Sequence, residues 1–115
     1  MPYLSLCTSV ETPRAAQEKL LLTLAENVSE ILGKPPGVMM TSFVSGTMTM
    51  AGEAGPTAFV DLRSIGKPST EQALALTKGL CETLGEALGI HPKRVYVNIT
   101  DVPGANWGCN NKTFG

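Results

Sequence analysis

Apolar residues recur at the three- and four-residue spacing of an amphipathic helix in two stretches of the chain. The first stripe consists of Leu21, Leu24, Val28 and Ile31, and the second of Ala73, Leu76, Leu80, Leu84 and Leu88. Before the first stripe we predict a cap at Thr12 with Pro13 at the first helical position. Before the second, Ser69 and Gln72 predict a capping box. Both helices should end at a left-handed glycine, Gly33 and Gly89 respectively.

Four other stretches alternate apolar and polar residues, which predicts strands at 2–8, 39–45, 57–63 and 94–100. One face of these strands is mostly apolar and suited to carry the helices: Leu4, Leu6, Met39, Thr41, Phe43, Ala58, Val60, Leu62, Val95, Val97 and Ile99. The opposite face is mixed: Tyr3, Ser5, Met40, Ser42, Phe59, Asp61, Tyr96 and Asn98. Two helices cover only one face, so we expect the mixed face to be covered by another subunit.

The two halves of the chain share one pattern at an offset of 56 positions. The stretch from Leu32 to Pro36 then lies over the stretch from Leu88 to Pro92. Each half reads strand, helix, strand, the order of a βαβ unit. We therefore predict an α+β domain over residues 1–115 with an internal repeat of 2–56 and 57–115. Its four-stranded mixed sheet would carry two antiparallel helices on one face, plus short edge strands.

The segment 45–56 between the halves is rich in Gly, Thr, Met and Ala. The simplest interpretation is a connector with a short edge strand at 47–50. An alternative is that Met48 and Met50 pack against a neighbouring subunit.

Composition narrows the function classes. The 115 residues are 43% hydrophobic and 17% charged, with a net charge of −1 and no basic cluster, so neither nucleic acid nor an anionic membrane is an expected partner. No apolar run is long enough to span a membrane, and the first residues do not form a signal peptide. A cytoplasmic location is expected, with secretion without a signal peptide as the alternative. Three widely spaced cysteines and a single histidine give no metal-ligand pattern, so no metal or cofactor is expected.

The amino terminus offers the clearest candidate chemistry. The only histidine, His91, precedes a proline and suits a turn, and no nucleophile triad or phosphate loop is present. Pro2 is small enough to permit removal of Met1, which would expose a secondary amine. An α-amino group titrates near pH ~7.7–8.0, and burial or a nearby cation such as Lys34 would lower its pKa. Such an amine is a good general base and also a competent nucleophile toward carbonyls.

Five short motifs, in order along the whole chain, resemble the macrophage migration inhibitory factor family of tautomerases with a catalytic amino-terminal proline. They are Met1-Pro2, Gly33-Lys34-Pro35-Pro36, Ser64-Ile65-Gly66-Lys67, Arg94-Val95-Tyr96-Val97-Asn98 and Asn110-Asn111-Lys112-Thr113-Phe114. The resemblance implies a homotrimer with active sites between adjacent subunits.

The resemblance also implies roles for particular residues. Pro2 would be the acid/base, and Lys34 with the backbone around Ile65 would hold the substrate's carboxylate and oxygen. The neighbouring subunit would supply Tyr96 and Asn98, while Trp107 and Phe114 would form apolar walls. Each has a plainer alternative: Lys34 suits a helix C-terminus, Ile65 suits packing, Tyr96 an interface, Asn98 a hydrogen bond on the sheet, and Phe114 the docking of the tail.

The implied reaction is keto–enol exchange in an aryl-substituted 2-oxo acid such as phenylpyruvate. Compared with the better-known animal members, Thr57-Ala58-Phe59-Val60 replaces a CxxC, Val38 replaces an aromatic, and the tail reads Trp107-Gly108-Cys109. These changes make thiol oxidoreductase activity unexpected and dopachrome a less secure substrate. Two alternatives stay open: a cytokine-like binding or signalling protein, and decarboxylation or dehalogenation by the same amine. The latter would need an arginine such as Arg63, for which an ion pair with Asp61 is the plainer role.

Overall fold

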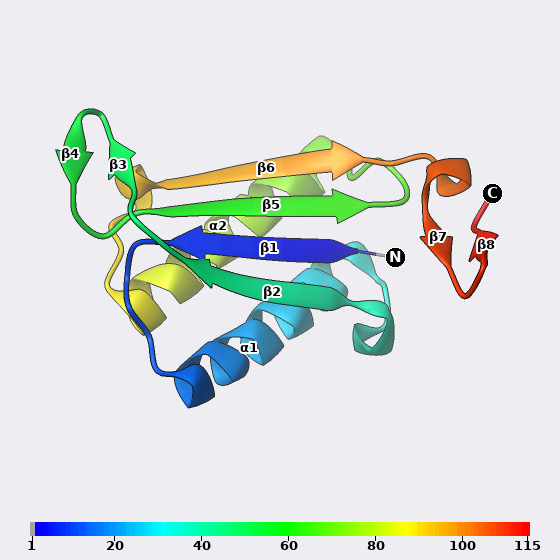
Figure 1. The fold of residues 1–115 in the computed structure, drawn as a ribbon. Helices are drawn as coiled ribbons and strands as arrows, with labels where there is room; N and C mark the ends of the chain where they lie inside the picture. The colour runs from blue at the N-terminus through cyan, green and yellow to red at the C-terminus, as the bar shows by residue number, and fades with distance from the viewer. Residues whose placement is uncertain (1) are drawn as a thin grey trace.

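The computed structural model describes residues 2–115. A four-stranded sheet carries two long helices on one of its faces (Figure 1). Its strands are β1 (Tyr3–Thr8), β2 (Met40–Ser45), β5 (Ala58–Ser64) and β6 (Val95–Asp101), and its helices are α1 (Arg14–Leu32) and α2 (Thr70–Leu88). Short 3₁₀ turns η1 (Pro36–Val38), η2 (Pro92–Arg94) and η3 (Gly104–Asn106) precede β2, β6 and the tail. Two hairpins complete the fold: β3 (Thr49–Met50) with β4 (Glu53–Ala54), and β7 (Gly108–Cys109) with β8 (Lys112–Thr113).

The sheet has the order β2-β1-β5-β6, with parallel outer pairs and an antiparallel pair at the centre. The predicted α+β class, the mixed sheet and the antiparallel helices on one face are therefore confirmed (Figure 1). Within each half the helix crosses over between two parallel strands, as a βαβ unit requires.

The two halves match closely in register. Residue 3 pairs with residue 40 and residue 58 pairs with residue 95, an offset of 37 in both halves. Helix α1 spans 14–32 and α2 spans 70–88, so each end is displaced by 56 positions. The same displacement relates η1 (36–38) to η2 (92–94). The central β1–β5 pairing joins the halves.

The core lies between the helices and the predicted apolar face of the sheet. It is formed by Leu4, Leu6, Val60 and Leu62 from the strands and by Leu20, Leu24, Val28, Leu76, Leu80 and Leu84 from the helices. On α1 the buried stripe includes Leu20, while Leu21 is only partly buried. On the opposite face Met40, Phe59 and Tyr96 are 66%, 37% and 62% exposed. This open face is the one for which the sequence predicts a partner subunit.

The helix ends differ in one respect from the prediction. The capping box of Ser69 and Gln72 is present, and Gly33 and Gly89 have φ of 66° and 68° in the left-handed region. The predicted Thr12 cap is wrong: Pro13 occupies the cap position of α1, without a side-chain cap. The Thr12 hydroxyl instead donates to the Val10 carbonyl, so it does not serve the first turn of the helix.

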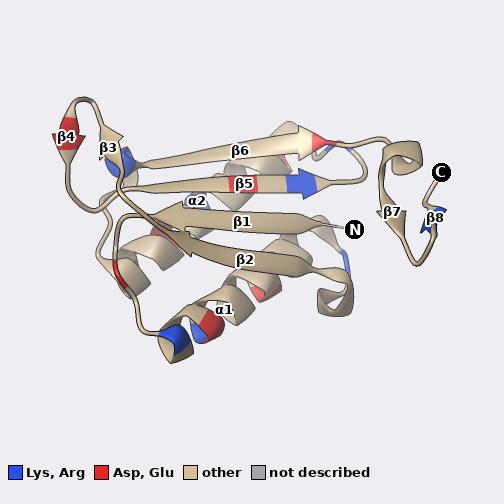
Figure 2. Ribbon diagram, viewed as in Figure 1, with Lys and Arg blue, Asp and Glu red and all other residues tan. Residues whose placement is uncertain are grey.

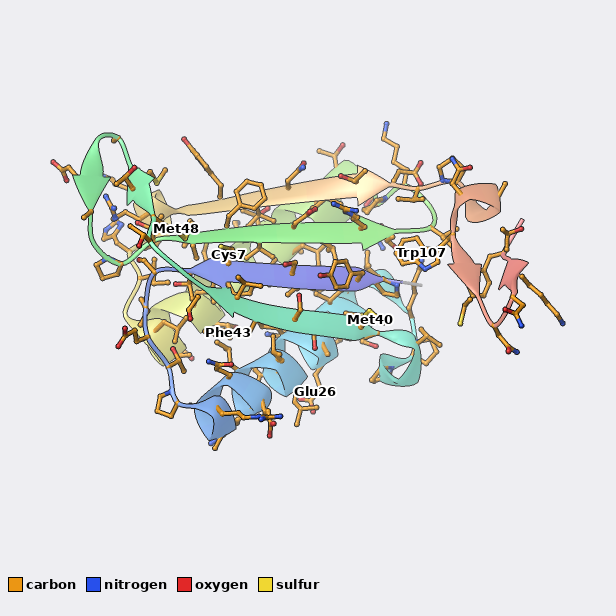
Figure 3. All side chains as sticks on the ribbon, viewed as in Figure 1. Cys7, Glu26, Met40, Phe43, Met48 and Trp107 are labelled. Carbon is orange, nitrogen blue, oxygen red and sulfur yellow. The ribbon has the colours of Figure 1, made fainter. Side chains whose placement is uncertain are left out.

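The connector between the halves forms its own hairpin. The predicted strand at 47–50 is shorter and pairs with β4, not with the four-stranded sheet. Met48 turns back toward the open face, where its Sδ lies 3.9 Å from the Cys7 Sγ (Figure 3). Arg94 holds this hairpin by donating to the carbonyls of Glu53 and Pro56 at 3.0 and 2.9 Å and to the Thr57 hydroxyl at 2.7 Å.

Charged residues are spread over both helices, strands β5 and β6, and the two hairpins, whereas β1 and β2 carry none (Figure 2). In the part of the chain that the structure describes, no helix combines the length and the hydropathy needed to cross a membrane.

Candidate active site

Pro2 lies at one end of the central strand pair and is fully buried. The alternation along β1 places it on the helix-covered face with Leu4 and Leu6. Its carbonyl accepts a hydrogen bond from the Met40 amide at 3.1 Å, which ties it to the start of β2. Because Tyr3 pairs antiparallel with Arg63, Pro2 lies beside the residue that follows, Ser64, the last of β5. Met1 lies outside the described residues, so its removal stays a prediction.

Lys34 reaches the same end of the sheet from the end of α1. Gly33 reverses the chain direction in the left-handed conformation, and the Lys34 amide then bonds to the Ser29 carbonyl at 3.1 Å. The Ser29 hydroxyl in turn donates to the Lys34 carbonyl. The Lys34 Nζ donates to the Ile65 carbonyl at 2.5 Å and to the Ser64 hydroxyl at 2.9 Å. The structure therefore brings Pro2, Lys34 and Ile65 together at one end of β5.

The loop after β5 is held by the end of β6. The Val102 amide donates to the Ser64 carbonyl at 2.9 Å. The Gly66 amide donates to the Asp101 Oδ1 at 3.1 Å, and Gly66 has φ of 96°, a conformation that favours glycine. These bonds fix the backbone around Ile65.

Tyr96 and Asn98 lie elsewhere in the chain. Both are exposed, and their partners on β5 are Phe59 and Asp61. Tyr96 therefore lies toward the opposite end of the sheet from Pro2, and Asn98 lies near its middle. The structure does not bring these two residues to Pro2 within one chain.

Trp107 takes part in a cleft of about 410 Å³ at the Pro2 end of the open face. Figure 3 shows Trp107 and Met40 at this end of the sheet. The cleft is lined by Tyr3, Met40, Arg63, Val102, Asn106, Trp107 and Gly108. Phe114 does not line it: its side chain is half-exposed, and its amide bonds to the Gly104 and Trp107 carbonyls at 3.1 Å. Val38 ends η1, and Met40 rather than Val38 lines the cleft.

Polar groups also border this cleft. The Tyr3 hydroxyl and the Ser42 hydroxyl form a hydrogen bond of 2.9 Å, and hydrogen bonds from Ser42 and Ser5 lower the Tyr3 pKa below its ordinary value. Arg63 forms an ion pair with Asp61 at 3.2 Å, as expected from the plainer alternative for that arginine, and it also lines the cleft. A cation and two aromatic rings thus surround a largely apolar space.

A larger cleft of about 640 Å³ lies at the other end of the molecule, between residues 9–11, 45–48 and 54–56. None of the residues implied by the motifs lines it. Within residues 2–115, no three His, Cys, Asp or Glu side chains gather as a metal site would need. Cys7, Cys81 and Cys109 are free thiols.

Sequence reasoning did not identify Ser64 and Asp101 as site residues. Ser64 is buried against the Lys34 ammonium, and Asp101 binds the Gly66 amide. Both occupy the last position of their strands and pair with each other in register. The sequence did contain a signal for them, because polar residues at the carboxyl ends of adjacent parallel strands are typical of binding sites.

The comparisons with known proteins match this chain to one family along its whole length. The family model described as macrophage migration inhibitory factor matches residues 1–115. The macrophage migration inhibitory factor of Rattus norvegicus is 37% identical over 116 residues, covering 99% of both chains. The chain belongs to the macrophage migration inhibitory factor family.

Solved structures similar to this chain share its fold. The homologue from Prochlorococcus marinus is 34% identical with a TM-score of 0.92, covering 98% of this chain and 99% of that one. A protein named Pt0534, solved after inactivation by 2-oxo-3-pentynoate, is 23% identical with a TM-score of 0.86, covering 96% of this chain and 95% of that one. At that identity the second likeness shows the fold alone.

Although the chain contains an internal repeat, only its first half has the pair of Pro2 and Lys34. At the displacement of 56 positions, Pro2 corresponds to Ala58 and Lys34 to Ile90. Ile90 is 1% exposed and belongs to the core, and Ala58 is also buried. In the second half, apolar side chains therefore occupy the space that holds the Lys34 cation in the first half.

Proposed function

We propose that this chain is a keto–enol tautomerase of aryl-substituted 2-oxo acids such as phenylpyruvate, with Pro2 as general acid and base after loss of Met1. The observation that carries the proposal is the meeting of Pro2, Ser64 and the Lys34 ammonium at one end of the sheet. Membership of the macrophage migration inhibitory factor family supports it.

The surroundings of Pro2 favour a neutral amine. Its ring is buried at the edge of the core, and burial disfavours the charged form of an amine. In protein that begins at Pro2, the Lys34 ammonium on the neighbouring Ser64 would lower the amine pKa further by charge repulsion. An amine that is neutral near the working pH can take a proton from the enol or from the carbon beside the ketone and return it at the other position.

Lys34 supplies the charge that a 2-oxo acid requires. Two of its hydrogen bonds go to Ser64 and Ile65, and an ammonium has three donors, so one donor is left for a carboxylate oxygen. The aryl group would lie in the cleft at the same end of the sheet, against Tyr3, Met40 and Trp107. Such a cleft is apolar enough to bury a ring and open enough to admit it.

We further propose that the protein acts as a homotrimer in which Tyr96 and Asn98 of one subunit complete the site of the next. Both side chains are exposed on the open face and far from Pro2 of their own chain. The exposed Met40, Phe59 and Tyr96 give this face the apolar surface that a subunit contact would bury.

The test combines processing with activity. Mass spectrometry defines the amino terminus of the purified protein, and ketonisation of phenylpyruvate enol is followed by ultraviolet absorbance. Protein beginning at Pro2 should be active, and Pro2→Ala should lower kcat/KM about a hundredfold, as expected for loss of a well-placed general base. Pro13→Ala, at the exposed start of α1, is the matched control and should retain full activity.

A second probe reports on the amine directly. Incubation with 2-oxo-3-pentynoate, the compound that inactivates Pt0534, should add its mass to the peptide beginning at Pro2 and abolish turnover. Correctly processed protein that neither ketonises the enol nor reacts at Pro2 would overturn the proposal. Full activity in Pro2→Ala would do the same.

A further inference from the structure

One peptide group in the candidate site has a charged partner on each side. The carbonyl of Ile65 accepts from the Lys34 Nζ at 2.5 Å. The amide of Gly66 donates to the Asp101 Oδ1 at 3.1 Å. This carbonyl and this amide belong to the same planar peptide unit and point in opposite directions. An ammonium and a carboxylate therefore hold that unit between them.

The fold places Asp101 for this contact. Asp101 is the last residue of β6 and pairs in parallel register with Ser64, the last residue of β5. The bond from the Val102 amide to the Ser64 carbonyl keeps the two strand ends together. The positive φ of Gly66 then turns the loop so that its amide faces the carboxylate.

We infer that Asp101 is a positioning residue for Lys34 and acts through the Ile65–Gly66 peptide. The carboxylate fixes the plane of the peptide and so the direction of the Ile65 carbonyl. It also polarises the peptide, which makes that carbonyl a stronger acceptor for the ammonium. A lysine side chain has several rotatable bonds, and a fixed acceptor restricts where its charge lies.

This inference rests on the proposed function to the extent that Lys34 binds the substrate carboxylate. It assigns Asp101 an effect on substrate binding and none on the proton transfer itself. Asp101 ends β6, whereas Pro2 directly precedes β1 on the far side of β5, so a strand separates the carboxylate from the amine.

The experiment measures KM and kcat for phenylpyruvate in Asp101→Ala, Asp101→Asn and the unaltered protein. We expect Asp101→Ala to raise KM roughly three- to tenfold with kcat nearly unchanged, since one charge-assisted hydrogen bond is lost. Asp101→Asn keeps an oxygen acceptor without the charge, so its KM should lie between those of the unaltered protein and Asp101→Ala. Glu82→Gln, which removes one negative charge from the exposed face of α2, is the control and should leave both constants unchanged.

The route through Lys34 is tested by combining variants. Lys34→Ala should raise KM by itself, and adding Asp101→Ala to it should cause no further rise. A merely structural role for Asp101 would add its full effect in both backgrounds. An additive result, or a loss confined to kcat, would overturn the inference.

A readout without turnover separates this inference from the proposed function. In NMR spectra the Gly66 amide signal should move upfield in Asp101→Ala, and the affinity for phenylacetate, an unreactive aryl carboxylate, should fall three- to tenfold. If the unaltered protein has no tautomerase activity, these two measurements still decide the role of Asp101. Unchanged phenylacetate affinity alongside a displaced Gly66 signal would overturn it. Asp101→Asn serves in the same test if Asp101→Ala does not fold.

Discussion

The Lys34 ammonium is held by a buried hydroxyl and a backbone carbonyl. Ser64 is 1% exposed, and its Oγ lies 2.9 Å from the Lys34 Nζ. The Ile65 carbonyl accepts from the same ammonium, and its oxygen lies 3.4 Å from the Ser64 Oγ. A flexible surface cation is thereby converted into one with a defined position, which a binding site for a carboxylate needs.

The three thiols differ in their surroundings, and one of them has a shifted pKa. Cys81 is half-buried on α2, and burial raises its pKa above the ordinary thiol value. In a Cys7→Ser, Cys109→Ser double variant, the reaction of Cys81 with Ellman's reagent should therefore keep accelerating above the pH at which an ordinary thiol levels off. Stopped-flow rates from pH 7 to 10 measure this.

The same shift has a defined sign for stability. The folded state holds the Cys81 proton more tightly than the unfolded state does. The stabilisation from this group is therefore full below the ordinary thiol pKa and is lost as the pH rises through the raised value.

In the test with Ellman's reagent, a reaction rate that levels off at or below the ordinary thiol pKa would contradict the expected burial of Cys81.

Some single residues of the site could be predicted from the sequence, and others could not. Pro2 and Lys34 stand in recognisable motifs, and their meeting follows from two strands and one helix end. Asp101 acts only through a loop turn at Gly66, with φ of 96°, and through strand register. Neither the turn nor the register is visible in the spacing of residues along the chain. Ser64 was one residue beyond the predicted strand end, which hid its pairing.

The two helices begin differently, and this difference can be measured. α2 has a complete capping box, in which the Ser69 Oγ accepts from the Gln72 amide at 3.0 Å. We expect Ser69→Ala to lower the free energy of unfolding by about 1 kcal/mol. Thr12→Ala is the matched comparison and should change it by less than about 0.5 kcal/mol, because Thr12 does not cap α1. Urea denaturation of both variants is the measurement.

Equal losses in the two variants would show that Thr12 supports α1 in solution after all. The capping box was predictable because its two hydrogen bonds are local to four consecutive residues. The start of α1 was not, because Pro13 extends the backbone with φ of −59° and ψ of 147° at the cap position itself. The preceding threonine is then outside the helix.

Strand positions were predictable to within one residue because alternation is strong on both faces. The pairing of the connector strand β3 with β4 could not be predicted from the sequence. A strand of two residues has too little pattern to show whether it joins a sheet or a hairpin. Ala51 and Gly52, with φ of 52° and 76°, decide the matter in favour of a tight turn between β3 and β4.

At the level of the whole molecule, the proposed site needs residues that one chain holds far apart. If Tyr96 and Asn98 act on the neighbouring subunit's Pro2, two defective variants should complement each other. Pro2→Ala and Asn98→Ala proteins, unfolded together at equal amounts and refolded, should regain about a quarter of the unaltered activity, since one site in four pairs two intact residues. Each variant refolded alone provides the baseline.

An absence of any gain, together with a monomeric mass by analytical ultracentrifugation, would contradict the shared site. The sequence supported an assembly because the open face is too apolar for water. The number of subunits came from the resemblance, since no pattern along one chain encodes the rotation that relates copies.

The central antiparallel pair joins strands from opposite halves, so β1 lies in the middle of the sheet although it is made first. Its partner β5 begins at Ala58. A ribosome adds roughly 5–20 residues each second, so the strand that pairs with β1 is not yet available for several seconds of synthesis. During that interval an aminopeptidase can reach the Met1–Pro2 bond. Once β5 docks, Pro2 becomes part of the interior, so translation is the period in which the nitrogen proposed to act as the base would be released.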